Sequence, residues 1–176
     1  MPRTDDEATG GVSMPRKSMI AAALGAALAL ALASASFAQQ GSFGTADEAK
    51  AMLMKAVAAV KADKAKGLDM IAKVEGGFRD RDLYPYCFNL SDGTLYPFAN
   101  PNLTAVFGKD HRTLKDPKGF NFGEVIFETV TRNPEGQIAE VGGIMLPKPG
   151  SDPTPVPKTV FVTKVGDLGC GVGYYN

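Results

Sequence analysis

The sequence lacks tryptophan, has one histidine and two cysteines, and carries no net charge, because 19 basic side chains balance 19 acidic ones. A nucleic-acid binder needs a basic surface that displaces the counterions of the phosphates, so we expect no nucleic-acid partner. One histidine and two cysteines fall short of the four nitrogen or sulfur ligands that a zinc site normally takes. The composition therefore predicts neither a nucleic-acid partner nor a bound metal, and we expect no cofactor.

Long apolar runs are also scarce, and the one clear example lies near the N-terminus. Arg16 and Lys17 precede an apolar run from Met19 to Ala33, which small residues follow up to Ala38. A basic start, an apolar centre and a small-x-small exit are typical of a secretory signal peptide. We therefore predict a signal peptide over residues 1–38, with Met14 as an alternative start because acidic residues precede it.

Cleavage after Ala38 would leave residues 39–176, a length that suits one domain of ~100–200 residues. The alternative is an uncleaved anchor, because the apolar stretch approaches the ~20 residues that span a bilayer. Either way, the rest of the chain is expected outside the cytoplasm, in the periplasm or secreted.

The first part of this domain is predicted to be one long amphipathic helix. Thr45 and Glu48 have the spacing of a capping box, and apolar residues recur at helical intervals from Ala49 to Val74. The helix should end at Gly76-Gly77. Gly67 is a weak point inside it, because glycine costs ~1 kcal/mol relative to alanine in a helix.

Strand patterns dominate the rest of the chain. A short helix is expected at 122–130, and a proline-rich loop at 147–157 separates two of the strands. We predict an α+β fold in which the long helix packs on one face of a five-stranded antiparallel sheet with short helical loops. The five expected strands are 84–90, 94–98, 138–146, 159–165 and 169–175.

The last strand alternates glycine with larger residues. Gly169, Gly171 and Gly173 share one face of this strand, and no helix follows them to form a phosphate-binding loop. Alternate glycines instead indicate that bulky side chains approach this face. If the first and last strands are neighbours, Cys87 and Cys170 share the other face. They would then form a disulfide or remain two buried thiols.

Nothing in the sequence requires catalysis. His111 lies in a polar loop, where we expect it to be solvated. No Gly-x-Ser-x-Gly motif presents a serine nucleophile, and a thiol hydrolase built on Cys87 and His111 is the remaining enzymatic alternative. We therefore expect a protein that is not an enzyme.

The chain after the long helix contains an ordered set of short motifs: Phe78-Arg79-Asp80-Arg81-Asp82-Leu83-Tyr84, Asn89-Leu90-Ser91-Asp92-Gly93-Thr94-Leu95, Asn100-Pro101-Asn102-Leu103, Gly108-Lys109-Asp110, Leu114-Lys115-Asp116-Pro117-Lys118-Gly119, Pro149-Gly150, Pro157-Lys158 and Gly171-Val172-Gly173-Tyr174-Tyr175. With the long helix and these motifs, the chain from Thr45 to Tyr175 resembles single Cache domains, which are extracytoplasmic small-molecule sensors built on a PAS-like sheet. It departs from the family at Tyr96-Pro97, where His-Pro is frequent, and at Gly142-Gly143, where an aromatic residue is frequent.

The resemblance implies a strand order of 2-1-5-4-3, which places the first and last strands side by side. It also implies a pocket between the sheet and the helical loops for an organic acid or a similar metabolite. Lys158 would supply a point charge for a carboxylate, and Arg112 a second cation. Tyr86, Phe122 and Phe161 would line the pocket.

The family further implies a domain that binds a small polar metabolite without chemistry and signals through a separate partner, such as a membrane receptor or kinase. The long helix is the expected contact with that partner or with a second copy of the chain in a homodimer. The departures from the family pattern favour one alternative, an envelope interaction or scaffolding module whose pocket is collapsed.

Overall fold

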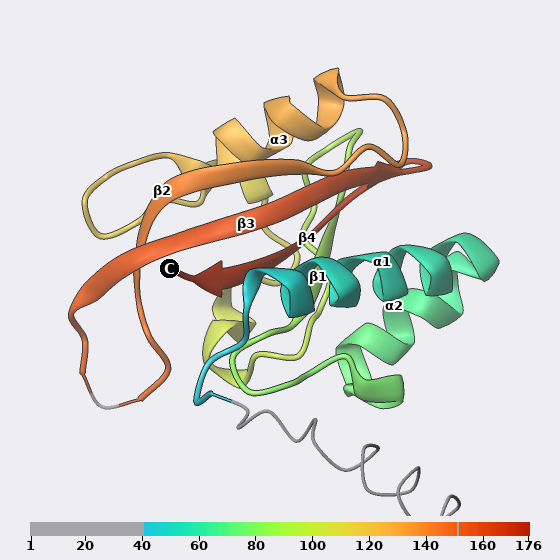
Figure 1. Cartoon of the computed structure of the whole chain (residues 1–176). Coiled ribbons are helices and arrows are strands. Elements are labelled where there is room, and N and C mark those ends of the chain that lie inside the picture. Colours follow the sequence, from blue (N-terminus) through green and yellow to red (C-terminus); the bar gives the residue numbers. More distant parts are fainter. Residues whose placement is uncertain (1–40, 151) are drawn as a thin grey trace, which may run out of the picture. The chain divides into compact units, whose positions relative to one another are not determined.

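The computed structural model describes residues 41–150 and 152–176 (Figure 1), so the signal peptide predicted for residues 1–38 lies outside the described residues. Within this part of the chain, no helix combines the length and the apolar character needed to cross a bilayer.

The predicted long helix is wrong: two helices, α1 (Ala46–Ala62) and α2 (Lys64–Lys73), meet at Asp63. The capping box of Thr45 and Glu48 starts α1 as predicted. Asp63 is extended, with φ −158° and ψ 108°, and its side chain accepts a hydrogen bond from the backbone N–H of Lys66. Asp63 therefore ends one helix and caps the next, as aspartate commonly does at an N-cap.

The break lets α2 pack against α1, and Gly67 is the point of closest approach. A Cβ built on Gly67 would lie 2.7 Å from the backbone nitrogen of Val60. Gly67 is therefore present for helix packing, and the helix breaks at Asp63 rather than at Gly67, the weak point of the sequence pattern.

The sheet has four antiparallel strands in the order β1-β4-β3-β2, so the first and last strands are neighbours as expected. Its strands are β1 (Pro85–Asn89), β2 (Ala139–Pro147), β3 (Pro155–Val165) and β4 (Leu168–Tyr175).

The fifth strand, expected at 94–98, is wrong. This segment forms only isolated bridges, from Leu95 to Phe88 and from Thr94 to Asp110. The backbone N–H of Leu95 donates to the carbonyl of Lys109, and Pro97 has no N–H to extend a ladder along β1.

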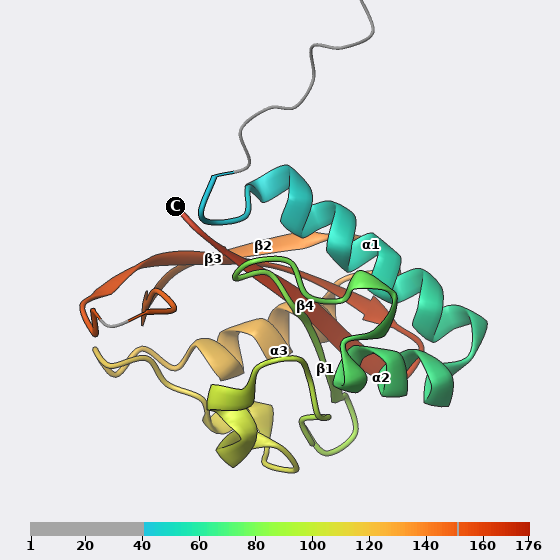
Figure 2. The same cartoon turned by 90° about the horizontal axis from the view of Figure 1, so that it is seen from below.

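The two faces of the sheet are covered by different helices (Figure 2). Helix α1 packs on one face, and α3 (Phe122–Arg132) packs on the other, near the 3₁₀ helices η2 (Pro101–Val106) and η3 (His111–Thr113). Cys87 and Cys170 are opposite each other in the β1–β4 register and are joined by a disulfide. This disulfide is on the face that α1 covers, because alternation along each strand separates it from the α3 face.

The glycines of β4 make room on the α3 face, as the sequence predicts. A Cβ on Gly169 would lie 2.4 Å from the Phe88 ring, and one on Gly171 would lie 2.8 Å from the Tyr86 hydroxyl. Because real Cβ atoms do not approach neighbours this closely, glycine is required for these side chains to lie across β4.

Candidate functional site

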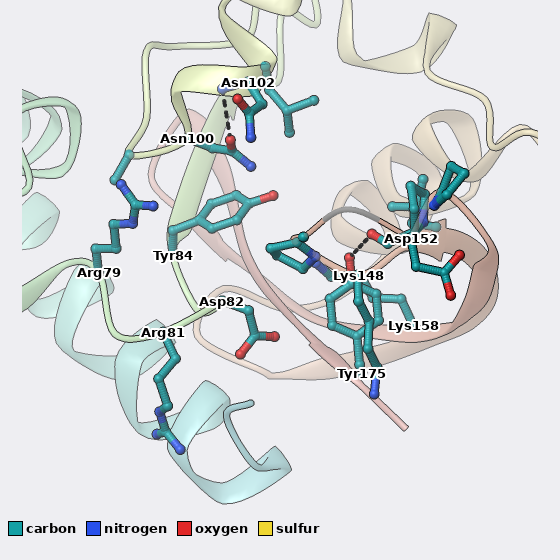
Figure 3. Close-up of a pocket in the computed structure, with 17 residues that line it drawn as sticks. Arg79, Arg81, Asp82, Tyr84, Asn100, Asn102, Lys148, Asp152, Lys158 and Tyr175 are labelled. Carbon is teal, nitrogen blue, oxygen red and sulfur yellow. Dashed lines mark hydrogen bonds between the residues drawn. The ribbon is translucent and has the colours of Figure 1, made fainter. Parts of the chain in front are cut away.

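A polar cavity of about 400 Å³ opens at the end of the sheet where β4 finishes (Figure 3). Its walls come from the segment that precedes β1, the η2 region, the β2–β3 loop and the ends of β3 and β4. The residues that carry its polar groups are Arg79, Arg81, Asp82, Tyr84, Asn100, Asn102, Lys148, Asp152, Lys158 and Tyr175.

An apolar chamber of about 210 Å³ lies next to the polar cavity, between the sheet and the helical loops. A β-bulge at Gly142-Gly143 shifts the β2 register, so that Ile144 pairs with Lys158 and faces the chamber. Four residues line both spaces and form their common wall: Tyr84, Leu103, Leu146 and Lys158.

Lys158 is the buried cation in the wall that the two spaces share. It is 6% exposed, and its Nζ lies 4.3 Å from the ring centroid of Tyr175 and 5.6 Å from that of Tyr84. Within residues 41–150 and 152–176 it forms no salt bridge and no side-chain hydrogen bond. Burial lowers the pKa of Lys158 to about 8, although the charge of Asp82 opposes this shift. The site therefore holds a desolvated ammonium group that no carboxylate of the described chain neutralises.

Asp82 is a buried acidic group on the same cavity. It is 4% exposed, and its Oδ1 accepts a hydrogen bond of 2.7 Å from the backbone N–H of Gly44. Its Oδ2 is buried and has no hydrogen-bond partner among the residues that the structure describes. Such groups are few in native proteins, and a polar partner such as a water or an ion commonly satisfies them.

Tyr175 connects the cavity to the segment that precedes α1. Its ring lies 6.1 Å from that of Phe43, in an edge-on arrangement, and its hydroxyl donates to the carbonyl of Pro147. Lys148 Nζ lies 4.4 Å from the ring centroid of Phe43. The side chains around the cavity mouth therefore contact residues just before the first helix.

Arg81 lines the cavity but is already paired. Its guanidinium forms salt bridges of 2.7 Å with both Glu48 and Asp80. Arg81 therefore fixes the segment before β1 to the start of α1.

The expectation of a solvated His111 is wrong. This residue is 1% exposed and stacks on Phe88 with 4.2 Å between ring centroids, and its Nδ1 lies 3.2 Å from the carbonyl oxygen of Gly123. Burial lowers the pKa of His111 to about 4, so the ring is neutral near pH 7. The thiol hydrolase built on Cys87 and His111 fails because Cys87 is in a disulfide and has no free thiol.

Three of the five residues named from the sequence line the two spaces. Lys158 lies in their common wall, and Tyr86 and Phe122 line the apolar chamber. Arg112 lines neither space, because it forms a salt bridge of 2.7 Å with Asp110 and its guanidinium lies 4.9 Å from the Phe127 ring centroid. Phe161 also lines neither: it stacks on Tyr174, on the opposite face of the sheet from Lys158.

The sequence interpretation missed most of the polar cavity. Tyr84 lies two residues before Tyr86, so strand alternation places both side chains on the same face, and this was the available signal for Tyr84. Asp82 lies two residues before Tyr84, so continuing the strand alternation backwards from β1 would place Asp82 on the same face. Asn100 and Tyr175 were part of the family motifs, without a role.

Three solved structures that are similar to this chain have names that refer to chemosensing or chemotaxis. The first comes from work on carboxylic acid recognition by a Cache chemosensory domain. It is 21% identical with a TM-score of 0.55, over 73% of this chain and 91% of that chain. The periplasmic sensor domain of a chemotaxis protein is 21% identical with a TM-score of 0.50, and the match covers 73% of this chain and 88% of that chain. A methyl-accepting chemotaxis protein from Vibrio parahaemolyticus is 17% identical with a TM-score of 0.50, and the match covers 73% of this chain and 86% of that chain.

No protein-family model and no curated protein matches the chain. The agreement with the solved structures nevertheless extends over nearly all of the domain, since it covers 73% of a chain whose described part begins at residue 41. The chain therefore has the fold of Cache chemosensory domains, as the resemblance in its sequence predicts.

Proposed function

We propose that this protein is an extracytoplasmic, non-catalytic sensing domain that binds a small carboxylate at Lys158. The observation that carries the proposal is the buried Lys158 ammonium group, which lies between a polar and an apolar space and has no counter-ion among the described residues. A desolvated charge is costly unless it is paired, so an anionic ligand would stabilise it.

The size and chemistry of the walls agree with this ligand class. A cavity of about 400 Å³ lies within the range of ~300–1,000 Å³ typical of small-molecule sites. The solved Cache domain that is similar to this chain is described as recognising carboxylic acids. The apolar chamber next to Lys158 would take the carbon chain of such an acid.

Ligand occupancy would be passed to a separate partner, such as a membrane receptor or kinase, through the start of α1. Tyr175 lines the cavity and contacts Phe43, and Asp82 lines it and holds Gly44. A ligand that shifts either side chain would change the contacts of the residues just before α1. The outer face of α1 is the proposed contact with the partner or with a second copy of the chain.

The alternative is an envelope interaction or scaffolding module with a collapsed pocket. The two spaces of about 400 and 210 Å³ argue against collapse. The departures from the family pattern at Gly142-Gly143 also have an explanation, because the bulge there directs Ile144 to the chamber wall.

A thermal-shift panel of small carboxylates, amino acids, amines and sugars tests the proposal. A ligand at a hundredfold excess over Kd should stabilise the folded state by ~2.7 kcal/mol, which raises the Tm by several degrees. Selective shifts by carboxylate-containing compounds would support the sensing domain. A flat response across the panel would favour the interaction module, and capture of an envelope partner by the protein would then be the next experiment.

A further inference from the structure

We infer that the polar cavity binds a small zwitterion, such as an amino acid, with its carboxylate at Lys158 and its ammonium group at Asp82. This inference rests on the proposed function and extends it, because Lys158 alone would accept any small carboxylate.

Asp82 is the first observation behind the inference. Its Oδ1 accepts a hydrogen bond from the backbone N–H of Gly44, whereas its Oδ2 is buried and has no partner within residues 41–150 and 152–176. A carboxylate oxygen only accepts hydrogen bonds, so the missing group must be a donor. Figure 3 shows the Asp82 carboxylate pointing into the space between the segment before β1 and Tyr175.

The relation of Asp82 to Lys158 is the second observation. Both side chains are less than 10% exposed and line the same cavity, yet no salt bridge within 4.0 Å joins them in the described chain. Two opposite buried charges that face one space without pairing are neutralised together by a ligand that carries both charges.

The other charged groups of the cavity do not compete for this role. Arg81 is paired with Glu48 and Asp80, and Arg79 and Asp152 are exposed at the rim. Lys148 lies over the ring of Phe43. Lys158 and Asp82 are therefore the two charged groups buried in the wall, and they fix the orientation of the ligand.

Tyr84 and Tyr175 complete the recognition surface between the two charges. Both rings lie within 6 Å of Lys158 Nζ, and both residues line the cavity. The cavity volume of about 400 Å³ far exceeds the ~30 Å³ that one water molecule occupies in the liquid. It therefore has room for a ligand with several heavy atoms that spans from Lys158 to Asp82.

The test compares ligands that differ only in the group next to the carboxylate. Calorimetry on the purified protein would use alanine against propionate, and leucine against 4-methylpentanoate, so that each pair has one carbon skeleton with and without the ammonium group. We expect the amino acid of at least one pair to bind ten times more tightly or better. This comparison needs no variant, so it stands even if a variant fails to fold.

Asp82→Asn is the matched substitution. It keeps an acceptor oxygen for the N–H of Gly44 but replaces the unpartnered oxygen by an amide donor. We expect it to weaken amino-acid binding at least tenfold and to leave the simple carboxylate of the same pair unchanged or tighter. Asp47→Asn, at an exposed position of α1 that lines neither space, is the control and should leave both affinities unchanged.

The outcomes separate this inference from the proposed function. Simple carboxylates that bind as tightly as the amino acids, with affinities that Asp82→Asn does not change, would overturn the zwitterion and leave the carboxylate site at Lys158 standing. Failure of both members of every pair to bind would overturn the zwitterion and count equally against the carboxylate site.

Discussion

Gly173 on β4 provides the space in which the Lys158 side chain lies: a Cβ at position 173 would lie 2.5 Å from Lys158 Cε. The main cation of the site thus depends on the absence of a side chain on the neighbouring strand. The same strand makes room for Tyr86 at Gly171 and for Phe88 at Gly169. The glycine stripe of β4 therefore shapes the walls of the candidate site as well as the core.

Gly173→Ala should reduce ligand affinity at least tenfold with little loss of stability. The new methyl group displaces the flexible end of Lys158, which can move, so we expect the unfolding free energy to change by less than about 1 kcal/mol. Gly142→Ala is the control, because its Cβ would meet Thr159 Oγ1 at an ordinary 3.5 Å. Calorimetry and urea unfolding measure both effects, and wild-type affinity in Gly173→Ala would contradict the assigned role of Lys158.

Lys158→Met should make the unliganded protein more stable at pH 7. Burial lowers the pKa of Lys158 from 10.5 to about 8, so between these values the unfolded chain binds more protons than the folded one. Wild-type stability should therefore rise from pH 8 to 10.5. Removing the charge should add on the order of 3 kcal/mol at pH 7, at ~1.4 kcal/mol per pKa unit. Urea unfolding at several pH values measures this, and a less stable variant at pH 7 would contradict the buried charge.

His111 should make the protein less stable in acid. Burial lowers the pKa of His111 from 6.5 to about 4, so between these values the unfolded chain binds the extra proton. Stability should fall by up to about 3 kcal/mol as the pH drops through this window. His111→Phe keeps an aromatic ring against Phe88 and should flatten the dependence between pH 4.5 and 6.5. Chemical unfolding across this range measures it, and an unchanged slope in the variant would assign the effect to other groups.

The Cys87–Cys170 disulfide should contribute strongly to stability. It closes a loop between residues 83 positions apart, and both cysteines are buried. Cys87→Ala combined with Cys170→Ala should lower the unfolding free energy by about 2–5 kcal/mol. Thermal unfolding with and without reductant measures the loss. Alkylation of two thiols in the unreduced, unfolded protein would show that the bond is absent.

Gly67→Ala should destabilise the protein, although alanine normally stabilises a helix. Propensity alone would favour alanine by ~1 kcal/mol, but the new Cβ would meet the Val60 backbone at 2.7 Å. Backbone cannot yield as a flexible side chain can, so α1 and α2 must separate. Thermal unfolding measures the effect, with Ala65→Gly at an exposed position of α2 as the comparison. A Tm raised by Gly67→Ala would contradict the close contact.

Local signals in the sequence predict much of this fold. Three features could be predicted because they depend on short-range spacing or on the family resemblance: the capping box, the adjacency of the first and last strands, and the glycine stripe. Lys158 could be predicted as a pocket residue from the same resemblance. The break at Asp63 could not be predicted, because the apolar periodicity continues across it and the contact that favours it, Gly67 against Val60, is tertiary.

The errors in the site have separate causes. Strand alternation could have excluded Phe161 from the pocket wall. It is three positions after Lys158 in the same strand, and residues three apart in a strand lie on opposite faces. His111 lies in a polar stretch, and only packing against Phe88 and Gly123 buries it. Asp82 lies in an alternating run of Arg and Asp that suggests a solvated surface, but in the structure it is 4% exposed and accepts a hydrogen bond from the distant Gly44, a tertiary contact that local sequence does not show.

Calorimetric titration of the carboxylate-containing compound that gives the largest thermal shift tests the central claim most directly. The titration would use the wild-type protein, Lys158→Met and Lys164→Met. Lys164 lies on the same face of β3 but lines neither space, so it controls for the general loss of a positive charge. We predict that Lys158→Met weakens binding at least a hundredfold, while Lys164→Met binds like the wild type. Equal affinities in all three proteins would show that the ligand does not bind at Lys158 and would contradict the proposed site.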